Sequence, residues 1–459
     1  MSALYPVHST ARPVWRAFPF LAMVLLLCVA ALPACGKARR ERPHVLLVVL
    51  SGARPDHMSA YGYAKPTTPT LARLAAEGTL FENAVTTTPW SLSAQASLVS
   101  GLFPSEHGAV FEHPVLEARI QTLAEAMKGS GYDTFGVTTD DQLGQANGFG
   151  QGYDVFKEVR PVEKGLPDEG GAAAETELLG WLASRQDKDR SFFATVILTN
   201  PRLPFNPQGE FQQKFIQTPI PLPRLEQMTQ FWIPFARQFT LDLVTLRPEE
   251  TAALVGLYDG EIGYADYRLG RILEALGKDA LLDDTLVVVT GDAGEDLGDH
   301  GAIADVSNVW DSLIRVPLVM RLPERVAAGA RETGQVQTVD VMDAVVKLTA
   351  PPAGAPGTAA GPLMRPRPAA IVEARFDPAA IRYYESVMPA SEAAIFRRNL
   401  LAVRTPDMKY ILNSQGGVAL FDLKADPGET RSVAPERPDD AREMSARLNA
   451  WASGLKAPS

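Results

Sequence analysis

A run of apolar residues near the start of the chain constrains the fold more than any other feature. Residues 44–50 (HVLLVVL) show no polar alternation after the first histidine, and Pro43 and Gly52 bound them. A run of this kind predicts a strand that is covered on both faces, as in a parallel sheet. Residues 286–290 form a second such run, and residues 316–322 are a third candidate strand.

Helical patterns separate these strands along the chain. They occupy residues 70–77, 116–128, 172–185 and 249–276. Strands that alternate with helices predict the α/β class, with a doubly wound sheet. Ligands of such sheets bind beyond the carboxyl ends of the strands, so the residues just after Leu50 and Thr290 are the expected place for chemistry.

The last quarter of the chain has a different pattern. Residues 351–370 are rich in Pro, Gly and Ala, which predicts a long loop or linker. Short alternating strands are expected after it, at residues 400–404, 408–412 and 418–423, followed by a helix at residues 439–455. We therefore expect an α/β domain over residues 44–350 and a small α+β subdomain with an antiparallel sheet over residues 371–459.

The N-terminal segment has the pattern of an export signal. Two arginines precede an apolar run at residues 18–34, and small residues lead from it to Cys35. This resembles a bacterial lipobox, so residues 1–35 are expected to be a signal peptide with Cys35 as the lipidated residue, and residues 36–43 a linker. An uncleaved membrane anchor is the alternative. The expected location is the bacterial cell envelope, with the outer membrane or the periplasmic face favoured and the lipid anchor binding the membrane.

Charge and cysteine content exclude two classes of function. The net charge of −10 argues against a nucleic-acid-binding protein, which needs a basic face to neutralise phosphates. The two cysteines of the chain, Cys28 and Cys35, both lie in the N-terminal segment. The part expected to fold therefore has no disulfide bond and no cysteine nucleophile.

A series of motifs in a fixed order points to a known family. They include RPDH at residues 54–57, TTPTLARLAAEG at 67–78, ASLVSGLFP at 96–104, YDGEI at 258–262 and DPGE at 426–429. Together they resemble the bacterial sulfatases of the alkaline-phosphatase-like superfamily over most of residues 43–435. The resemblance implies a doubly wound mixed sheet with helices on both faces and a small C-terminal antiparallel sheet. It also implies hydrolysis of sulfuric esters with a divalent cation, often Ca²⁺, and a formylglycine nucleophile.

The positions that would hold this cation depart from the family pattern. The family has an aspartate ligand at the tip of the first strand, where this chain has Ser51. After the strand at residues 286–290, Asp292 is kept as a residual ligand position, but the neighbouring ligand is replaced by Ala293, whose side chain has no donor atom. One carboxylate thus remains where hard cations need several oxygen ligands.

The positions that would bind and cleave the ester also differ. Ser91 occupies the nucleophile position, but Gln95 replaces the cation that belongs to the same motif. Ile197 and Arg202 stand where the family has histidines, and Asp305 stands where it has a basic residue or histidine. Arg202 is then the candidate residue for binding an anion.

The histidines are expected to be structural. His44 begins a strand, His57 belongs to a turn, and His300 lies in a loop motif of the family. His107 and His113 are expected in surface loops.

Two hypotheses follow from these departures. The first is an exported lipoprotein with the sulfatase shape, impaired in hydrolysis, without a cofactor, that acts in binding or as a scaffold for an unidentified ligand or protein. The second is an active hydrolase of sulfate, phosphate or phosphonate esters. Ser91 would then be its nucleophile, and Asp292, Asp296 and Asp305 would hold Ca²⁺ or Mg²⁺ in a rearranged site.

Overall fold

The computed structural model describes residues 40–159, 170–217, 220–221, 223–224, 232–303, 307–350 and 363–455. The candidate lipidation site Cys35, the candidate residue Asp305 and residues 351–362 of the expected loop lie outside this part of the chain. Within the described ranges, no helix has the length and apolar character needed to cross a membrane. The contacts divide the chain after Arg40, and the fold described below belongs to the unit Glu41–Ser459.

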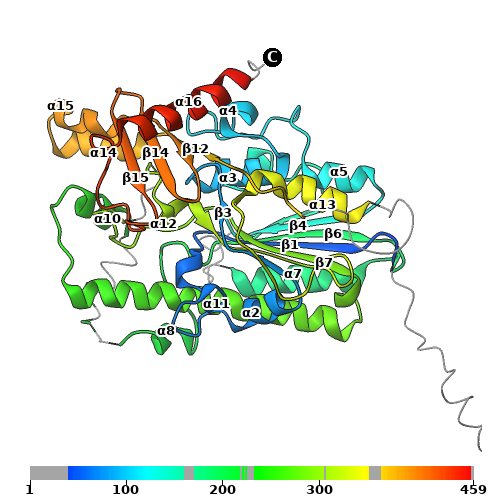
Figure 1. The fold of residues 1–459 in the computed structure, drawn as a ribbon. Helices are drawn as coiled ribbons and strands as arrows, with labels where there is room; N and C mark the ends of the chain where they lie inside the picture. The colour runs from blue at the N-terminus through cyan, green and yellow to red at the C-terminus, as the bar shows by residue number, and fades with distance from the viewer. Residues whose placement is uncertain are drawn as a thin grey trace, which may run out of the picture. The chain divides into compact units, whose positions relative to one another are not determined.

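The central element is a mixed eight-stranded sheet in the order β10-β2-β9-β7-β1-β6-β4-β5 (Figure 1). The four middle strands β7, β1, β6 and β4 run parallel to one another, and β9 runs antiparallel to β7. The strands are β1 His44–Leu50, β2 Thr79–Phe81, β4 Asp133–Thr138, β5 Val155–Glu158, β6 Phe192–Leu198, β7 Thr285–Gly291, β9 Leu318–Arg321 and β10 Ala330–Glu332. The predicted doubly wound α/β sheet is therefore confirmed.

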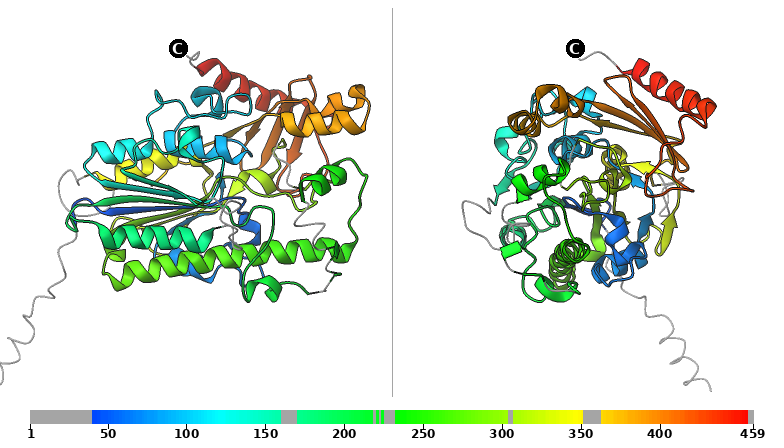
Figure 2. Two further views of the ribbon diagram at one scale, coloured as in Figure 1. Left: turned by 180° about the vertical axis from the view of Figure 1, so that it is seen from behind. Right: turned by 90° about the vertical axis from the view of Figure 1, so that its left-hand side faces the viewer.

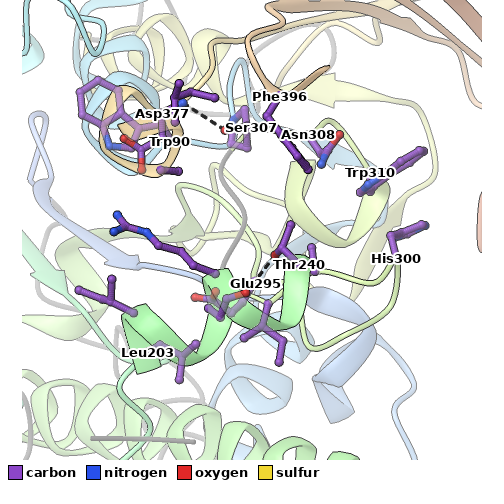
Figure 3. A pocket seen from close by; sticks show the side chains of 18 of the residues that line it. Trp90, Leu203, Thr240, Glu295, His300, Ser307, Asn308, Trp310, Asp377 and Phe396 are labelled. Atoms are coloured by element: carbon purple, nitrogen blue, oxygen red, sulfur yellow. Dashed lines mark hydrogen bonds between the residues drawn. The ribbon is translucent and has the colours of Figure 1, made fainter. Parts of the chain in front are cut away.

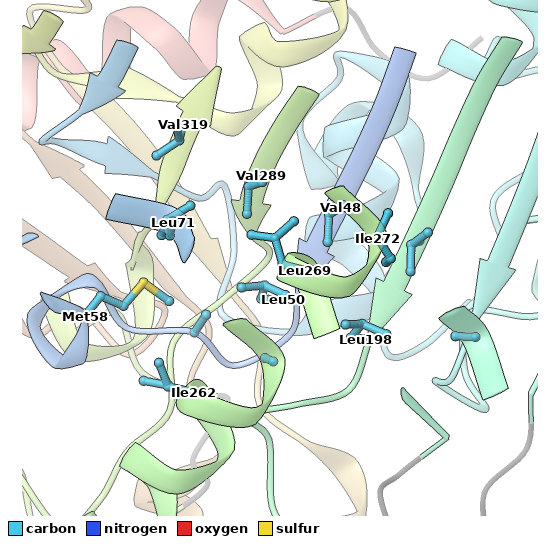
Figure 4. Packing of buried hydrophobic residues seen from close by; sticks show 14 of the residues in the cluster. Val48, Leu50, Met58, Leu71, Leu198, Ile262, Leu269, Ile272, Val289 and Val319 are labelled. Carbon is cyan, nitrogen blue, oxygen red and sulfur yellow. The ribbon is translucent and has the colours of Figure 1, made fainter. Parts of the chain in front are cut away.

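Helices cover both faces of this sheet, which explains the continuous apolar run in β1 (Figures 1 and 2). On one face lie α2 (Pro69–Ala76), α7 (Gly171–Ser184) and α11 (Pro248–Lys278); on the other lie α3 (Ser91–Ser100), α5 (Leu123–Gly129) and α13 (Val341–Thr349). Leu46, Val48 and Leu50 pack toward α11, as Figure 4 shows for Val48 and Leu50, and the intervening valines and leucine pack toward α3. Each such fully buried side chain contributes about 1.5–3 kcal/mol relative to exposure.

The third predicted strand is wrong as a single element. Pro317 divides it into β8 (Arg315–Val316), which joins β3 (Ala84–Val85) and β11 (Val336–Gln337) in a three-stranded sheet, and β9, which joins the central sheet. Proline has no N–H to donate to a strand ladder, so the chain changes sheets at this residue. Its carbonyl oxygen still accepts the N–H of Gly291 at 3.2 Å.

The helix predicted over residues 116–128 is wrong in its first half, because α5 begins only at Leu123. Thr122 ends the preceding loop with a capping box: its hydroxyl accepts the N–H of Glu125 at 3.2 Å, and the Glu125 carboxylate accepts the N–H of Thr122 at 2.8 Å. This reciprocal pair satisfies donors that would otherwise be free at a helix start.

The C-terminal part contains the expected antiparallel sheet. Its order is β12-β13-β14-β15, formed by Ala370–Ala374, Leu400–Arg404, Met408–Asn413 and Val418–Asp422. Helix α16 (Pro438–Gly454) packs on this sheet through Met444 and Leu448. Ala370, the last residue of the expected loop, already begins β12. Helices α14 (Pro378–Val387) and α15 (Ala390–Ala393) lie between β12 and β13, and α14 packs near α10 (Trp232–Thr240).

A buried ion cluster joins this sheet to the loop that follows β7. Lys409 on β14 is completely buried, and its ammonium lies 2.7 Å from Asp311 Oδ1 and 2.6 Å from Glu429 Oε1. The guanidinium of Arg404 also lies 2.7 Å from Asp311 Oδ2. Glu429 is the last residue of the DPGE motif, so the structure gives that motif a role in joining the two parts of the fold.

Candidate functional site

Four neighbouring parallel strands each end at a polar residue. Ser51 follows β1 and Asp292 follows β7, while Asp140 and Arg202 come within a few residues of the ends of β4 and β6. Because these strands run in the same direction, their carboxyl ends lie at one edge of the sheet. The four residues therefore gather where chemistry was expected.

The carboxylate of Asp292 is surrounded by hydrogen-bond donors from the protein. Its Oδ2 accepts the hydroxyl of Ser51 at 2.7 Å and the side-chain amide of Gln95 at 3.2 Å. Its Oδ1 accepts the backbone N–H of Ala293 at 2.6 Å and that of Gly52 at 3.3 Å. Asp292 is only 1 % exposed. Burial raises the pKa of this carboxyl above its ordinary value, against the opposing effect of Ser51 and Arg202.

These residues do not fit the divalent cation that the family resemblance implies. A hard cation needs several oxygens whose lone pairs point at it, whereas each oxygen of Asp292 already accepts two protein donors. Asp296 accepts the hydroxyl of Ser312 at 2.8 Å. Among the described residues, no group of three or more His, Cys, Asp or Glu side chains could hold a metal ion.

Arg202 lies across the tip of β1 and contacts the acidic side of the cluster. Its Nη1 donates to Asp140 Oδ2 at 2.8 Å. Burial lowers the pKa of Arg202, but the nearby Asp140, Asp292 and Glu295 raise it, and the net change is upward. Gly52 makes this position possible: its φ is +80°, and a Cβ there would lie 2.6 Å from Arg202 Cγ.

A cavity of about 490 Å³ opens beside this cluster (Figure 3). Ser91, Arg202 and Glu295 line it from the sheet side, and the rings of Trp90 and Phe111 stack 4.0 Å apart at its wall. The opposite wall comes from α10, α14 and the residues after α15, which contribute Arg237, Asp377, Phe396 and Arg398 among others. Figure 3 shows Glu295 near Thr240 of α10, with His300 and Trp310 farther along the wall.

Glu295 is the acid of this cavity with the most perturbed environment. It is 6 % exposed, and burial raises the pKa of its carboxyl to about 7, against Arg202, the N–H of Leu203 and Arg54, which lower it. The charged and neutral forms of Glu295 are thus both populated near neutral pH.

Ser91 opens helix α3 and faces the cavity. It is 6 % exposed, and Trp90 is the residue before the first turn. Within the described ranges, its hydroxyl makes no hydrogen bond to a histidine or a carboxylate. A serine needs such a base or a metal before it attacks an ester at neutral pH.

The other residues singled out from sequence lie elsewhere. Ile197 is buried within β6, in the apolar core on the α3 side of the sheet. His300 stacks on Trp310 at 4.3 Å, and His57 Nδ1 lies 2.9 Å from Asp259 Oδ1. The surface position expected for His107 is wrong, because this side chain is fully buried. Its Nδ1 accepts the N–H of Ala109 at 3.0 Å, and burial lowers its pKa to about 4.

Sequence patterns missed several residues of the cavity. Asp140 follows β4, a strand that was not recognised, although the rule of strand ends would have found it once β4 was known. Arg237 and Arg398 come from segments far from the motifs, so only the folded chain brings them to Ser91.

Comparison with known proteins places this geometry in a family. The sequence model of the sulfatase family matches residues 43–350. The multifunctional alkaline phosphatase superfamily protein PehA of Trinickia caryophylli is 26% identical, over 86% of this chain and 91% of its own. The N-acetylglucosamine-6-O-sulfatase of Bacteroides thetaiotaomicron is 22% identical, over 90% of this chain and 86% of its own.

Solved structures share the fold. The phosphonate monoester hydrolase of Agrobacterium radiobacter superposes with a TM-score of 0.72 at 23% identity, over 90% of this chain and 96% of its own. The phosphonate monoester hydrolase of Silicibacter pomeroyi gives 0.67 at 20% identity, over 89% and 95%. At these identities the likeness speaks for the fold alone.

Proposed function

The chain belongs to the sulfatase family, and on that premise we propose that it is a non-hydrolytic member, which binds an oxyanionic ester in the cavity beside Ser91 without a resident dication. The observation that carries the proposal is the environment of Asp292. Its two carboxylate oxygens accept four hydrogen bonds from protein donors, at 2.6 to 3.3 Å.

A cation at Asp292 would have to displace these donors. Each buried donor left without an acceptor costs about 1–3 kcal/mol. Ser51 and Gln95 both direct a hydrogen at Oδ2, which is the oxygen that a cation between β1 and β7 would need. Without that cation, Ser91 lacks the group that would activate it as a nucleophile.

The arginines that line the cavity support an anionic ligand. Arg202, Arg237 and Arg398 all face this space. A guanidinium matches the oxygens of sulfate, phosphate or phosphonate groups with paired hydrogen bonds. The stacked rings of Trp90 and Phe111 offer an apolar surface for the rest of the molecule. Sulfate and phosphonate esters are also the compounds that the names of the relatives mention.

Export and lipid anchoring complete the proposal. The pattern of arginines, an apolar run and Cys35 supports a lipoprotein of the cell envelope. Labelling with a radioactive fatty acid tests this point: label should enter the wild-type protein and be absent from a Cys35→Ser variant. Equal labelling of both proteins would contradict the lipid anchor.

One comparison tests the central claim. Purified protein is analysed for Ca²⁺ and Mg²⁺, and aryl sulfate, phosphate and phosphonate esters are offered to wild type and to Ser91→Ala. We expect no stoichiometric metal and no rate difference between the two proteins, while calorimetry detects binding of an aryl sulfate. Stoichiometric metal, together with turnover that disappears in Ser91→Ala, would instead establish the alternative hydrolase with a rearranged site.

A further inference from the structure

We propose that the cavity takes up an oxyanion together with a proton, and that Glu295 is the residue that receives this proton. The inference rests on the proposed function, since it concerns the same cavity. Glu295 lies in the loop after β7 and lines the space that also contains Ser91 and Arg202. Because it is nearly buried, water screens its charge only weakly from a ligand in that space.

The positive charges next to Glu295 are already engaged by other acids. Arg54 donates to the backbone oxygen of Glu295 at 3.0 Å, and its guanidinium is paired with Asp56 at 2.8 Å and Asp299 at 2.6 Å. Arg202 is paired with Asp140 at 2.8 Å. The charge of Glu295 is therefore not cancelled by a cation of its own.

The remaining charged groups around Glu295 come from three other elements. Asp292, at the end of β7, adds a further negative charge and raises the pKa of Glu295. Helix α10 contributes Arg237 to the cavity, Asp377 precedes α14, and Arg398 follows α15. An oxyanion that enters to meet the arginines thus meets the carboxylate of Glu295 in the same enclosed space.

Uptake of a proton from solvent removes this repulsion. The balance is simple: the Glu295 carboxylate, one proton and the anionic ligand give a neutral carboxylic acid beside the bound anion. Burial has already raised the pKa of Glu295 to about 7, so the proton is available near neutral pH. In the protonated form, the O–H of Glu295 also becomes a hydrogen-bond donor for the ligand.

The probe for this inference is 4-nitrophenyl sulfate, whose charge does not change between pH 6 and pH 9. Its dissociation constant is measured by calorimetry with the full chain in detergent. For wild type, we expect nearly constant affinity below pH 7 and a loss of roughly tenfold per pH unit above it. At pH 7, titrations in buffers of different ionisation enthalpy should show uptake of about half a proton per ligand. This second measurement needs no variant.

Glu295→Gln keeps the shape of the side chain without its charge. It should bind with the same affinity at pH 6 and pH 9, and at pH 8 it should bind about tenfold more tightly than wild type. Glu373→Gln is the matched control. Glu373 is also a buried acid with a raised pKa, but its Oε1 alone accepts both donors of Ser105, and it lies outside the cavity lining. This control should keep the wild-type pH profile.

The outcomes separate the two claims. If both wild type and Glu295→Gln bind the probe but share one pH profile, or if no proton is taken up at pH 7, the inference is overturned and the binding function stands. If neither protein binds the probe at any pH, the binding function itself is overturned, and the inference falls with it.

Discussion

The hydroxyl of Ser51 donates to the carboxylate of Asp292 over 2.7 Å, between the ends of two adjacent parallel strands. The family pattern has a second carboxylate at the position of Ser51, with a cation between the two acids. Here a neutral hydroxyl makes direct contact instead, so Asp292 is stabilised by hydrogen bonds and not by a metal. The predictions below start from this difference.

Ser51→Asp should destabilise the fold more than Ser51→Ala. The alanine variant removes one buried donor and should lower the free energy of unfolding by about 1–2 kcal/mol. The aspartate variant places two carboxylates side by side and should lower it by about 3–5 kcal/mol at pH 8. The difference should shrink as the pH falls, since one of the two acids can then be protonated. Urea denaturation at pH 8 and pH 5.5 measures both values, and equal stability of the two variants at pH 8 would contradict the account.

Arg202→Met should weaken both the fold and ligand binding. It leaves Asp140 buried without its cation, which we expect to lower the free energy of unfolding by about 2–4 kcal/mol, allowing for the 25% exposure of Arg202. Affinity for an aryl sulfate should fall by about tenfold or more. The double variant Arg202→Met, Asp140→Asn should recover part of the stability but none of the affinity. A double variant no more stable than the single one would show that the pair is not coupled.

Gly52→Ala should cost more than the same change at Gly62. Both glycines have positive φ, +80° and +100°, so each variant pays about 1 kcal/mol of backbone strain. Only at Gly52 would the new Cβ meet a neighbour, Arg202 Cγ at 2.6 Å, whereas nothing lies within 4 Å at Gly62. Gly52→Ala should therefore lose about 1–3 kcal/mol more in thermal or urea unfolding and also bind the aryl sulfate more weakly. Equal effects at the two sites would contradict the close approach of Arg202.

His107 should make the protein less stable in mild acid. Burial lowers its pKa from 6.5 to about 4, so the unfolded chain binds a proton that the folded chain does not bind between these values. The stability that depends on neutral His107 is complete above pH 6.5 and is lost as the pH falls toward 4. Between pH 7.5 and 4.5, wild type should lose about 2–3 kcal/mol more than His107→Gln in urea unfolding. Parallel pH dependence in the two proteins would show that His107 is not the group responsible.

Lys409→Met should separate the C-terminal sheet from the loop after β7. It leaves Asp311 and Glu429 buried close together without their shared ammonium, and should lower the free energy of unfolding by about 3–5 kcal/mol. Faster hydrogen exchange at Trp310, next to Asp311 and on the cavity wall, should accompany this loss. Lys424→Met, which removes a surface pair with Asp407, is the control and should change stability by less than about 1 kcal/mol. Similar losses in both variants would argue against a special role of the buried cluster.

The sequence predicted the parts of the fold that leave a local pattern. The strands at residues 44–50 and 286–290 are buried on both faces, and this burial is visible as uninterrupted apolar runs. Ser51 and Asp292 could be located because they directly follow those runs. Strand β4 (DTFGVT) contains polar residues and Gly136, so neither the strand nor Asp140 behind it was recognised.

The remaining features depend on contacts between distant segments. His107 lies in a short polar stretch that suggests exposure, yet α3 and its neighbours bury it. Arg237 and Arg398 are ordinary arginines in sequence, and only the approach of α10 and α14 brings them to the cavity of Ser91. Pro317 marks a break in a strand, but which sheet each half joins is decided by pairing partners far along the chain.

The four donors around Asp292 also bear on the history that is open to this chain. Restoring an aspartate at position 51 alone would set two acids against each other while Gln95 still points its amide hydrogens at them. Replacing Gln95 alone would leave the Asp292 carboxylate short of a donor and gain no ligand. Each single step back toward an ion-dependent ancestor therefore passes through a less stable protein, so the loss is self-reinforcing: descendants can diversify the cavity far more easily than they can recover the old chemistry.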